Sequence, residues 1–302
     1  MLKSRLIYIL LLITSNYAFT AHGLTFSIPK NSNIVGNLQT TKVKDGQSLG
    51  EIGRKFDVGV YEMIEANPNL NPWEPLVDAT VIIPTEFILP AGERQGIVIN
   101  LAEMRIYYFN LKQNLVTTHP IGIGKKGWNT PLGNLHIIQK VANPSWRPPS
   151  SIKADHAMRG DILPEVIPPG PDNPLGKYSM RLSIPTYLIH GTNKPGGIGF
   201  RSTSGCIRLL PEDIETLYPQ IAVGTTVRII HAPYKFGYRG ENIFLEAHQP
   251  LSEHHQATSS SAAMLEQALE EAAMGNVNID WQQAQKSIEQ SKGYPVPVHP
   301  TI

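Results

Sequence analysis

A proline-rich segment between residues 143 and 176 sets the strongest limit on what this chain can fold into. It reads NPSWRPPSSIKADHAMRGDILPEVIPPGPDNPLG and holds eight prolines. Because proline has no amide hydrogen to give to a sheet ladder, such a segment is excluded from the interior of a sheet. A long irregular segment in a compact domain is usually a functional loop or a linker. Since strand-like sequence resumes after it, we expect a lid or substrate-binding loop, with a linker as the alternative.

Strand-like sequence lies on both sides of this segment. Before it, residues 96–110 alternate apolar and polar side chains in two runs, with Ala102-Glu103 suited to the turn between them. LVTTHPIGIG and GNLHIIQKV are further strand candidates, and YSMRLS, TYLIHG and TTVRIIHA follow the proline-rich segment. LPEDIETLYPQI, with Pro211 in its first turn, predicts a short helix. Residues 96–231 therefore predict a mostly β domain with short helices.

A smaller unit is expected at residues 41–85. A strand is predicted around Val43, and Ser48 is suited to cap a helix that carries Leu49 and Ile52 on one face. A second helix is predicted from Val58 to Asn67, and a closing strand covers residues 80–83. The expected order is strand, helix, helix, strand around a very small core. Residues 24–40, before this unit, are expected to be an extended lead-in.

The N-terminus has the features of a secretory signal peptide. Lys3 and Arg5 precede an apolar run from Leu6 to Ile13, and Ala21-His22-Gly23 offers small residues to a signal peptidase. The run is shorter than the roughly 20 residues that a transmembrane helix needs. We therefore expect residues 1–23 to be a signal peptide cleaved near Gly23, with a buried N-terminal strand or helix as the alternative.

Charge and tail composition exclude some functions. The net charge is +1 and the basic residues are dispersed, so no nucleic-acid partner is expected.

Residues 232–302 contain the helix-prone stretches MLEQALEEAA and DWQQAQKSIEQ, but their apolar residues are sparse. We expect this tail to pack partly on the β domain with intermittent helix and without a core of its own.

The chain has one cysteine, Cys206. An exported protein with one cysteine cannot form an internal disulfide, so the thiol is expected to be either buried or functional. Ser204-Gly205-Cys206 places small residues before the thiol, in a turn whose amides can point at a developing oxyanion. The predicted helix after Cys206 would favour the thiolate if the thiol lay at its N-terminus.

His190 is the expected base. It ends the apolar run Tyr187-Leu188-Ile189, and the loop of residues 193–203 then leads back to Cys206. A thiol and a base are the minimum for covalent acyl transfer. The alternatives are an inert buried cysteine beside a hydrogen-bonding surface histidine, or a zinc site, for which these two residues supply too few ligands. The composite pattern H-G-T-x6-G-x4-S-G-C-I-R is more specific than any single member and favours the enzyme.

HGTNKPGGIGFRSTSGCIRL resembles the signature of the L,D-transpeptidase (YkuD-type) catalytic domain of cell-wall cross-linking enzymes. The other matching segments are residues 96–109, PIGIG, TPLG and PPGPDNPLGKYSMRLS. Residues 41–85 resemble a LysM glycan-binding module, departing from it at Thr41, where an aromatic residue is common, and at Asp78, where glycine is usual. A rigid spacer is the alternative for this unit. The segment order is similar to a Gram-negative periplasmic branch that includes enzymes attaching a lipoprotein to peptidoglycan.

The resemblance implies a β-sandwich-like catalytic domain that needs no cofactor or metal. It implies Cys206 as the nucleophile, His190 as the proton donor and acceptor, and the carbonyl of Gly191 as the group that orients His190. Ser204 and Gly205, with the amide of Cys206, would form the oxyanion region. Arg208 would either brace the cysteine loop or bind a substrate carboxylate.

The implied donor is a peptidoglycan tetrapeptide stem, and the implied acceptor is a second stem or a lysine of an outer-membrane lipoprotein. Carbapenem-type inhibitors would acylate the thiol. A sortase is the less favoured reading because its histidine and cysteine are usually farther apart, and papain-like endopeptidases carry the two residues in the reverse order. The non-enzymatic alternative is a peptidoglycan-binding envelope protein with an inert Cys206.

Overall fold

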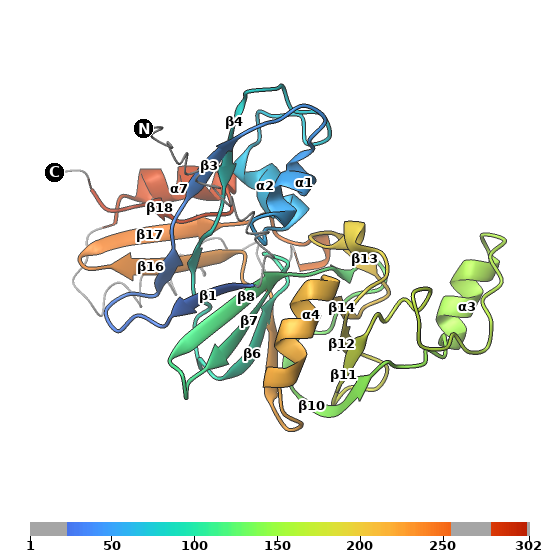
Figure 1. Ribbon diagram of the computed structural model, residues 1–302. Helices are drawn as coiled ribbons and strands as arrows, with labels where there is room; N and C mark the ends of the chain where they lie inside the picture. Colours follow the sequence, from blue (N-terminus) through green and yellow to red (C-terminus); the bar gives the residue numbers. More distant parts are fainter. Residues whose placement is uncertain (1–22, 255–278, 301–302) are drawn as a thin grey trace, which may run out of the picture.

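The main element of the computed structural model is a nine-stranded sheet (Figure 1), and residues 23–254 and 279–300 are described. Its strands, in spatial order, are β1 (Leu24–Ser27), β8 (Leu115–Pro120), β7 (Arg105–Asn110), β6 (Gly96–Asn100), β15 (Thr226–Ile230), β10 (Gly133–Ala142), β11 (Tyr178–Leu182), β12 (Leu188–His190) and β14 (Ile207–Arg208). The expectation of a mostly β fold with few short helices is confirmed.

One long strand joins the two halves of this sheet. The first residues of β10 pair with β15, and the residues from Ile137 onward pair with β11. The register shifts between Ile137 and Gln139, and a bulge of this kind bends a strand and increases its twist. A single curled sheet therefore supplies the layers that the sequence predicted as a sandwich-like domain.

Both faces of the sheet are buried near β6. Ile97 and Ile99 belong to a core that also contains Ile214 of α4 (Pro211–Leu217), whereas Val98 packs on the other face with Phe87 of β5 (Glu86–Ile88). This alternation follows from the two-residue period of a strand. The remaining short elements of the domain are β9 (Ile123–Gly124), β13 (Arg201–Thr203), η1 (Pro195–Gly197), η2 (Tyr218–Gln220) and η3 (Ser252–His254).

The proline-rich segment is a long excursion between two neighbouring strands. Its ends meet where the amide of Asn143 donates to the carbonyl of Lys177 at 2.8 Å. The buried side chain of Asn173 donates to the carbonyl of Pro144 at 2.7 Å. Its helix α3 (Ser150–Ala157) has no buried residue and projects away from the sheet (Figure 1). Because β10 and β11 pair directly, the segment is a loop within one domain and not a linker between domains.

The predicted strand, helix, helix, strand order is present in β3 (Gln39–Lys42), α1 (Leu49–Arg54), α2 (Val60–Ala66) and β4 (Thr80–Ile83). We call these elements the βααβ unit. Its own buried cluster includes Val43, which follows β3, and the Ser48 hydroxyl caps α1 by accepting from the amide of Glu51 at 3.2 Å. Asp78 has a φ of 64°, a left-handed conformation that favours glycine, the residue usual at this position, and that aspartate tolerates better than most other residues.

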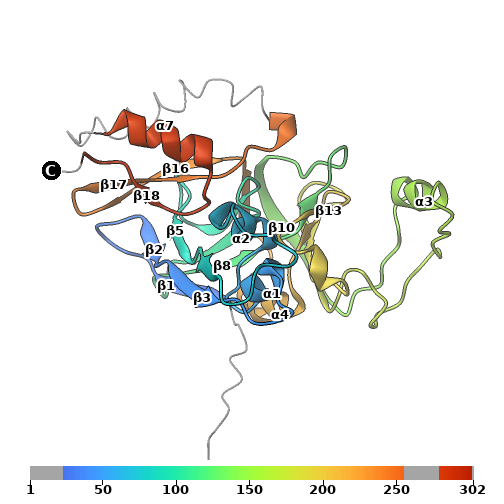
Figure 2. The same ribbon diagram turned by 90° about the horizontal axis from the view of Figure 1, so that it is seen from above.

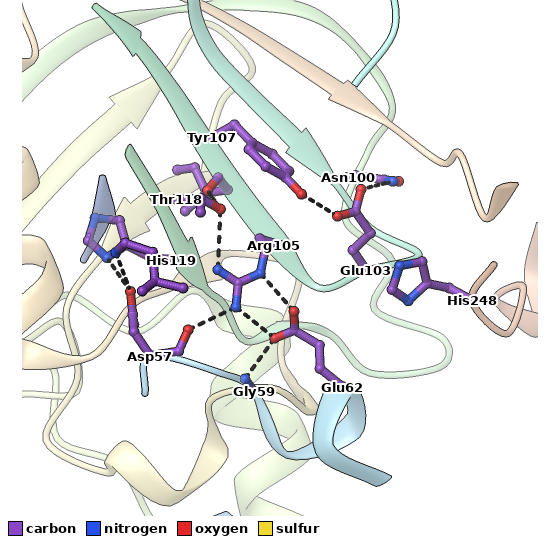
Figure 3. Close-up of polar contacts among 12 residues, drawn as sticks. Asp57, Gly59, Glu62, Asn100, Glu103, Arg105, Tyr107, Thr118, His119 and His248 are labelled. Carbon is purple, nitrogen blue, oxygen red and sulfur yellow. Dashed lines mark hydrogen bonds and ion pairs between the residues drawn. The ribbon is translucent and has the colours of Figure 1, made fainter. Parts of the chain in front are cut away.

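A buried ion pair joins the βααβ unit to the main sheet. Arg105 of β7 donates from Nε to Glu62 of α2 at 2.7 Å, and both side chains are almost completely buried (Figure 3). The same carboxylate accepts from the amide of Gly59 at 2.7 Å. The predicted lead-in is extended as expected, and it contributes β1 to the main sheet and β2 (Ile34–Gly36) to a pair with β5.

The tail differs from its prediction. It forms a small sheet of β16 (Tyr234–Arg239), β17 (Asn242–Ala247) and β18 (Val296–Pro297), covered by α7 (Trp281–Gln290). Ile243, Leu245, Ala284 and Val298 make a core of their own, so the expectation that the tail lacks one was wrong. The sequence missed it because residues more than 50 positions apart supply this core. Figure 2 shows these elements at the opposite end of the molecule from α3.

The predicted helix at DWQQAQKSIEQ is confirmed by α7. The helix-prone stretch MLEQALEEAA and the signal-peptide residues before Gly23 lie outside the described residues. Within the described part of the chain, no helix combines the length and apolar character required to cross a membrane.

Candidate active site

Two parallel strands bring Cys206 and His190 to the same face of the sheet. In β12 and β14, Ile189 pairs with Ile207 and His190 pairs with Arg208. Both isoleucines are fully buried in the main core. Since side chains alternate along a strand, His190 and Arg208 face the other way. Cys206 directly precedes β14, and extending the alternation by one residue puts its side chain on the same face. The thiol and the imidazole are therefore diagonal neighbours across adjacent strands.

His190 is buried and fixed by its own neighbour in the chain. Its Nδ1 lies 2.6 Å from the carbonyl oxygen of Gly191. Because a carbonyl can only accept, Nδ1 carries the hydrogen and Nε2 is left with a lone pair. Burial, followed by the positive charge of Arg208, lowers the pKa of His190 to about 3, against the opposing effect of hydrogen bonds with the backbone of Gly191 and Leu175. The imidazole is thus neutral near pH 7 and can accept a proton through Nε2.

Cys206 is partly exposed, and its thiol lies 3.6 Å from the carbonyl oxygen of Thr186. Burial raises its pKa, while a hydrogen bond with the backbone of Leu188 and the charge of Arg208 act in the opposite direction. The expectation that a helix N-terminus favours the thiolate was wrong, because β14 and two further residues separate Cys206 from Pro211, where α4 begins. The thiol is therefore neutral in the substrate-free site.

A strained turn holds the thiol in place. Gly205 has a φ of +102°, and a Cβ atom there would lie 2.8 Å from the ring of Tyr187, so this position requires glycine. The amide of Gly205 donates to the hydroxyl of Thr203 at 3.1 Å, and that hydroxyl donates to the carbonyl of Cys206 at 2.7 Å. Ser204, like Cys206, is half-buried. The Gly205 amide is thus already engaged in closing the turn.

Thr130 supports the turn from a distant strand connection. Its hydroxyl donates to the carbonyl of Gly205 at 2.9 Å and accepts from the amide of Gly124 at 3.1 Å. Thr130 lies in the TPLG segment, but sequence reasoning gave no role to it or to Thr203. A threonine beside a turn carries no signal of its own, and the contact between Thr130 and Gly205 joins residues 75 positions apart.

Arg208 places a positive charge beside both reacting groups. Its backbone bridges to Gly122, while its Nε is buried and has no hydrogen-bond partner among the described residues. Such an unpaired buried donor is costly unless a ligand accepts from it. Within the described ranges, neither Cys206 nor His190 belongs to a group of three His, Cys, Asp or Glu residues with the spacing of a metal site.

Comparison with known proteins matches the same region. The sequence profile of the L,D-transpeptidase catalytic domain (YkuD) matches residues 94–229. "Probable L,D-transpeptidase YcfS" of Escherichia coli (strain K12) is 43% identical over 231 residues, which cover 74% of this chain and 72% of the relative. "Probable L,D-transpeptidase ErfK/SrfK" of the same strain is 36% identical over 288 residues, which cover 92% of each chain.

Similarity to a solved structure is weaker. The catalytic domain from the E. faecium L,D-transpeptidase is 20% identical, and the match covers 47% of this chain and all of that domain's chain. Its TM-score of 0.36 is too low to bear on the fold. The sequence relatives, by their identity and coverage, establish the family. The chain belongs to the L,D-transpeptidase family of enzymes.

Proposed function

We propose that this enzyme is a periplasmic L,D-transpeptidase that acts on peptidoglycan stem peptides through a thioester on Cys206. The observation that carries the proposal is the placement of Cys206 and His190 on one face of adjacent strands, with the lone pair of His190 left on Nε2. Export to the periplasm rests on the signal-peptide features that end near Gly23. No cofactor or metal takes part in the proposed reaction.

In the first step, Sγ of Cys206 attacks the carbonyl carbon of the diamino acid at position three of a tetrapeptide stem. Nε2 of His190 takes the thiol proton and then gives it to the leaving nitrogen. The bond to the terminal D-alanine breaks, and a thioester remains. Because both groups are neutral at rest, proton transfer would accompany the attack instead of preceding it.

In the second step, an acceptor amine attacks the thioester and loses a proton to His190, and Cys206 leaves as the thiol. The amine belongs either to the diamino acid of a second stem, giving a 3–3 cross-link, or to a lysine of an outer-membrane lipoprotein. The energy of the donor peptide bond is conserved in the thioester, so neither product requires a nucleotide.

The proposed oxyanion contacts are the amide of Cys206 and the hydroxyl of Ser204. The amide of Gly205 would contribute only by exchanging its bond with Thr203. We assign Arg208 to a carboxylate of the donor peptide, because its buried Nε has no partner within the described part of the chain. A bracing role is less favoured, because an Arg208 that braced the cysteine loop would have its Nε–H paired with an acceptor of that loop.

We further propose that the βααβ unit binds glycan as a LysM-like module. A groove between α1 and the loop that leads to Cys206 is lined by Ser48, Trp73 and Phe200, among others. Trp73 is 67% exposed and stacks on Phe200 with ring centroids 6.4 Å apart. Exposed aromatic rings present flat apolar faces suited to sugar rings. A glycan held there would lie beside the loop that precedes the nucleophile.

Intact mass spectrometry tests the thioester directly. Residues 24–302 and the Cys206→Ala variant are each mixed with a disaccharide-tetrapeptide carrying meso-diaminopimelate. We expect release of D-alanine and a covalent adduct on the unsubstituted protein alone, and a carbapenem should label the same thiol. Lysine-bearing acceptors added afterwards identify the second substrate. If neither donor nor carbapenem labels Cys206, the proposed mechanism is wrong and a peptidoglycan-binding role becomes the better account.

A further inference from the structure

Three buried side chains from separate segments meet behind the active site. They are Asp57, which follows α1, His119 of β8 and Asp213 of α4, and each is at most 2% exposed. Nδ1 of His119 lies 3.4 Å from Oδ2 of Asp57 and 3.2 Å from Oδ1 of Asp213. Figure 3 shows His119 facing Asp57. These distances are those of ion pairs, since neither is a well-directed hydrogen bond. We call these three residues the His119 cluster.

The His119 cluster holds two carboxyl groups and one imidazole. Burial by itself lowers the pKa of His119, but Asp213 and Asp57 outweigh it and raise the pKa to about 9, so the imidazole is charged at pH 7. Burial raises the pKa of Asp213 to about 6, His119 opposes this rise and Asp57 adds to it. Two carboxyl groups therefore face one imidazolium.

Arg105 is a nearby cation and interacts with the charge of Asp57, but it makes no hydrogen bond to either carboxyl group of the cluster. Arg105 donates to the backbone carbonyl of Asp57 at 2.8 Å, but its guanidinium is paired with Glu62. Both carboxylate oxygens of Asp213, and Oδ1 of Asp57, lack hydrogen-bond partners among the described residues. Glu212 on the same helix adds further negative potential and raises the pKa of Asp213. Buried carboxylate oxygens without hydrogen-bond partners are costly, so the cluster is suited to bind a further cation.

The N-terminal strand enters at this cluster. The backbone nitrogen of Leu24, the first residue of β1, donates to Oδ2 of Asp57 at 3.1 Å. Leu24 also pairs with Thr118, the neighbour of His119. Gly23 lies directly against the imidazole, because a Cβ atom at this position would be 2.2 Å from Cε1 of His119. The bond between Gly23 and Leu24 is the one that the small-residue pattern Ala21-His22-Gly23 marks for a signal peptidase.

We propose that the His119 cluster is a binding site for the chain's own α-ammonium group, which is created when the signal peptide is removed after Gly23. This inference rests on the export that we propose for the enzyme. Hydrolysis of the peptide bond adds water, leaves the carboxylate on Gly23 and converts the Leu24 amide nitrogen into an amine that takes up a proton. The backbone N–H of Leu24, which donates to Asp57, becomes an ammonium group with three N–H donors. The carboxyl groups of Asp57 and Asp213 then face two cations, this ammonium group and the His119 imidazolium.

The site would couple processing to the stability of the mature enzyme. Loss of Gly23 opens space over the His119 ring, into which the ammonium group can move. The new ion pairs would join β1, the βααβ unit and α4. Because α4 follows β14 in the chain, the same cluster anchors the segment that carries Cys206. A chain that keeps its signal peptide would lack the Leu24 ammonium group and therefore these ion pairs, although all side chains of the cluster are present.

Amine reactivity and thermal unfolding test the proposal on whole chains. One protein begins at Leu24 with a free amine, and the other retains Ala21-His22-Gly23 before it; N-terminal sequencing verifies both. We expect the Leu24 amine to react with an acylating reagent about tenfold more slowly in the folded than in the denatured protein, which corresponds to a rise of about one pKa unit. The extended protein should unfold at a lower temperature.

Side-chain variants of the chain that begins at Leu24 locate the effect. Asp57→Asn should restore most of the amine's reactivity. Asp45→Asn is the matched control, since Asp45 is exposed in the same βααβ unit, and it should leave the reactivity unchanged. If Asp57→Asn does not fold, the comparison of the two N-termini decides the question with every side chain intact.

Several outcomes would overturn the proposal. They are an amine that reacts equally fast in folded and denatured protein, equal unfolding temperatures for the two chains, and a stoichiometric metal ion in the native mass spectrum, which would mean that a metal is the cation. An exported chain that starts at another residue would refute the cleavage site. Labelling of Cys206 by a carbapenem, measured on both chains, reports separately on the proposed function.

Discussion

His190 and His119 are both buried, yet they carry opposite charge states. His190 lies beside Arg208 and a backbone carbonyl, and its pKa is lowered to about 3. His119 lies between two carboxylates, and its pKa is raised to about 9. Burial disfavours the imidazolium at both positions, so the charged neighbours decide the outcome. The neutral His190 can accept a proton, and the charged His119 pairs with carboxyl groups from two other segments.

The surroundings of Cys206 and the contact between the βααβ unit and the main sheet also differ in how many charged groups they bury. Around Cys206 the structure has a neutral thiol, a neutral imidazole and hydroxyl-closed turns. Behind it, buried ion pairs such as Arg105 with Glu62 connect the βααβ unit to the sheet (Figure 3). His248 belongs to this second group, because Glu65 and Glu246 outweigh burial and raise its pKa to about 10. Apart from Arg208, the charged groups described here lie outside the active site and join the parts of the molecule around it.

The largest expected effect is on the acylation rate, when the neutral His190 is replaced. Replacing His190 with Gln removes the proton acceptor while keeping a polar side chain of similar length. We expect acylation of Cys206 by the donor peptide to slow by about 10²- to 10⁴-fold, the usual contribution of a general base. Single-turnover mass spectrometry measures this rate. His136→Gln is the control, since His136 is exposed on β10. An unchanged rate in His190→Gln would exclude His190 as the base.

A smaller effect is expected on the unfolding free energy, when the buried ion pair of Arg105 and Glu62 is broken. Glu62→Gln leaves the guanidinium of Arg105 buried without its carboxylate, which costs about 3–5 kcal/mol of unfolding free energy. Denaturant unfolding measures this loss. Replacing both residues with Met leaves no buried charge, and we expect that variant to recover most of the stability. If Glu62→Gln is as stable as the unsubstituted protein, this pair does not hold the βααβ unit.

The two histidines also predict opposite pH dependence of stability. The raised pKa of His119 gives a stabilisation that is fully present below pH 6.5 and is lost as the pH rises through about 9, on the order of 3 kcal/mol at most. The lowered pKa of His190 gives a stabilisation that is present above pH 6.5 and is lost as the pH falls toward about 3. Unfolding curves of the protein and of His119→Gln from pH 4 to 10 measure both.

The variant separates these contributions. His119→Gln should lose the part of the alkaline decline that ends near pH 9 and keep the part that His248 causes near pH 10. Its acid side should also change, because Asp213 loses the imidazolium that opposes the rise of its pKa to about 6. An alkaline decline identical in both proteins would show that His119 is not charged in the folded state.

The smallest effect comes from an exposed ion pair between the same two parts of the molecule. Arg54 of α1 and Glu212 of α4 lie 3.0 Å apart, with side chains 48% and 39% exposed. We expect Glu212→Gln to change the unfolding free energy by about 0–1 kcal/mol, because water screens the pair. A loss as large as that of Glu62→Gln would mean that burial does not distinguish the two pairs.

Much of the local structure could be predicted from the sequence. Strand alternation gave β6 and β7, and the capping pattern at Ser48 gave the start of α1. The pattern around His190 and Cys206 indicated the family and the two residues to which we assign the reaction. The tail's sheet escaped prediction because β17 pairs with β18, which lies some 50 residues further along the chain.

The sequence by itself determined which residues are available for chemistry, because residue type and local pattern are properties of short segments. Only the tertiary structure decided their charge states. Arg208 reaches His190 through the pairing of β12 with β14, and Asp57, His119 and Asp213 meet from three separate segments. Electrostatic interaction depends on distance and burial and not on separation along the chain. For that reason the helix expected to activate Cys206 could be drawn from the sequence, while the neutral thiol could be seen only in the fold.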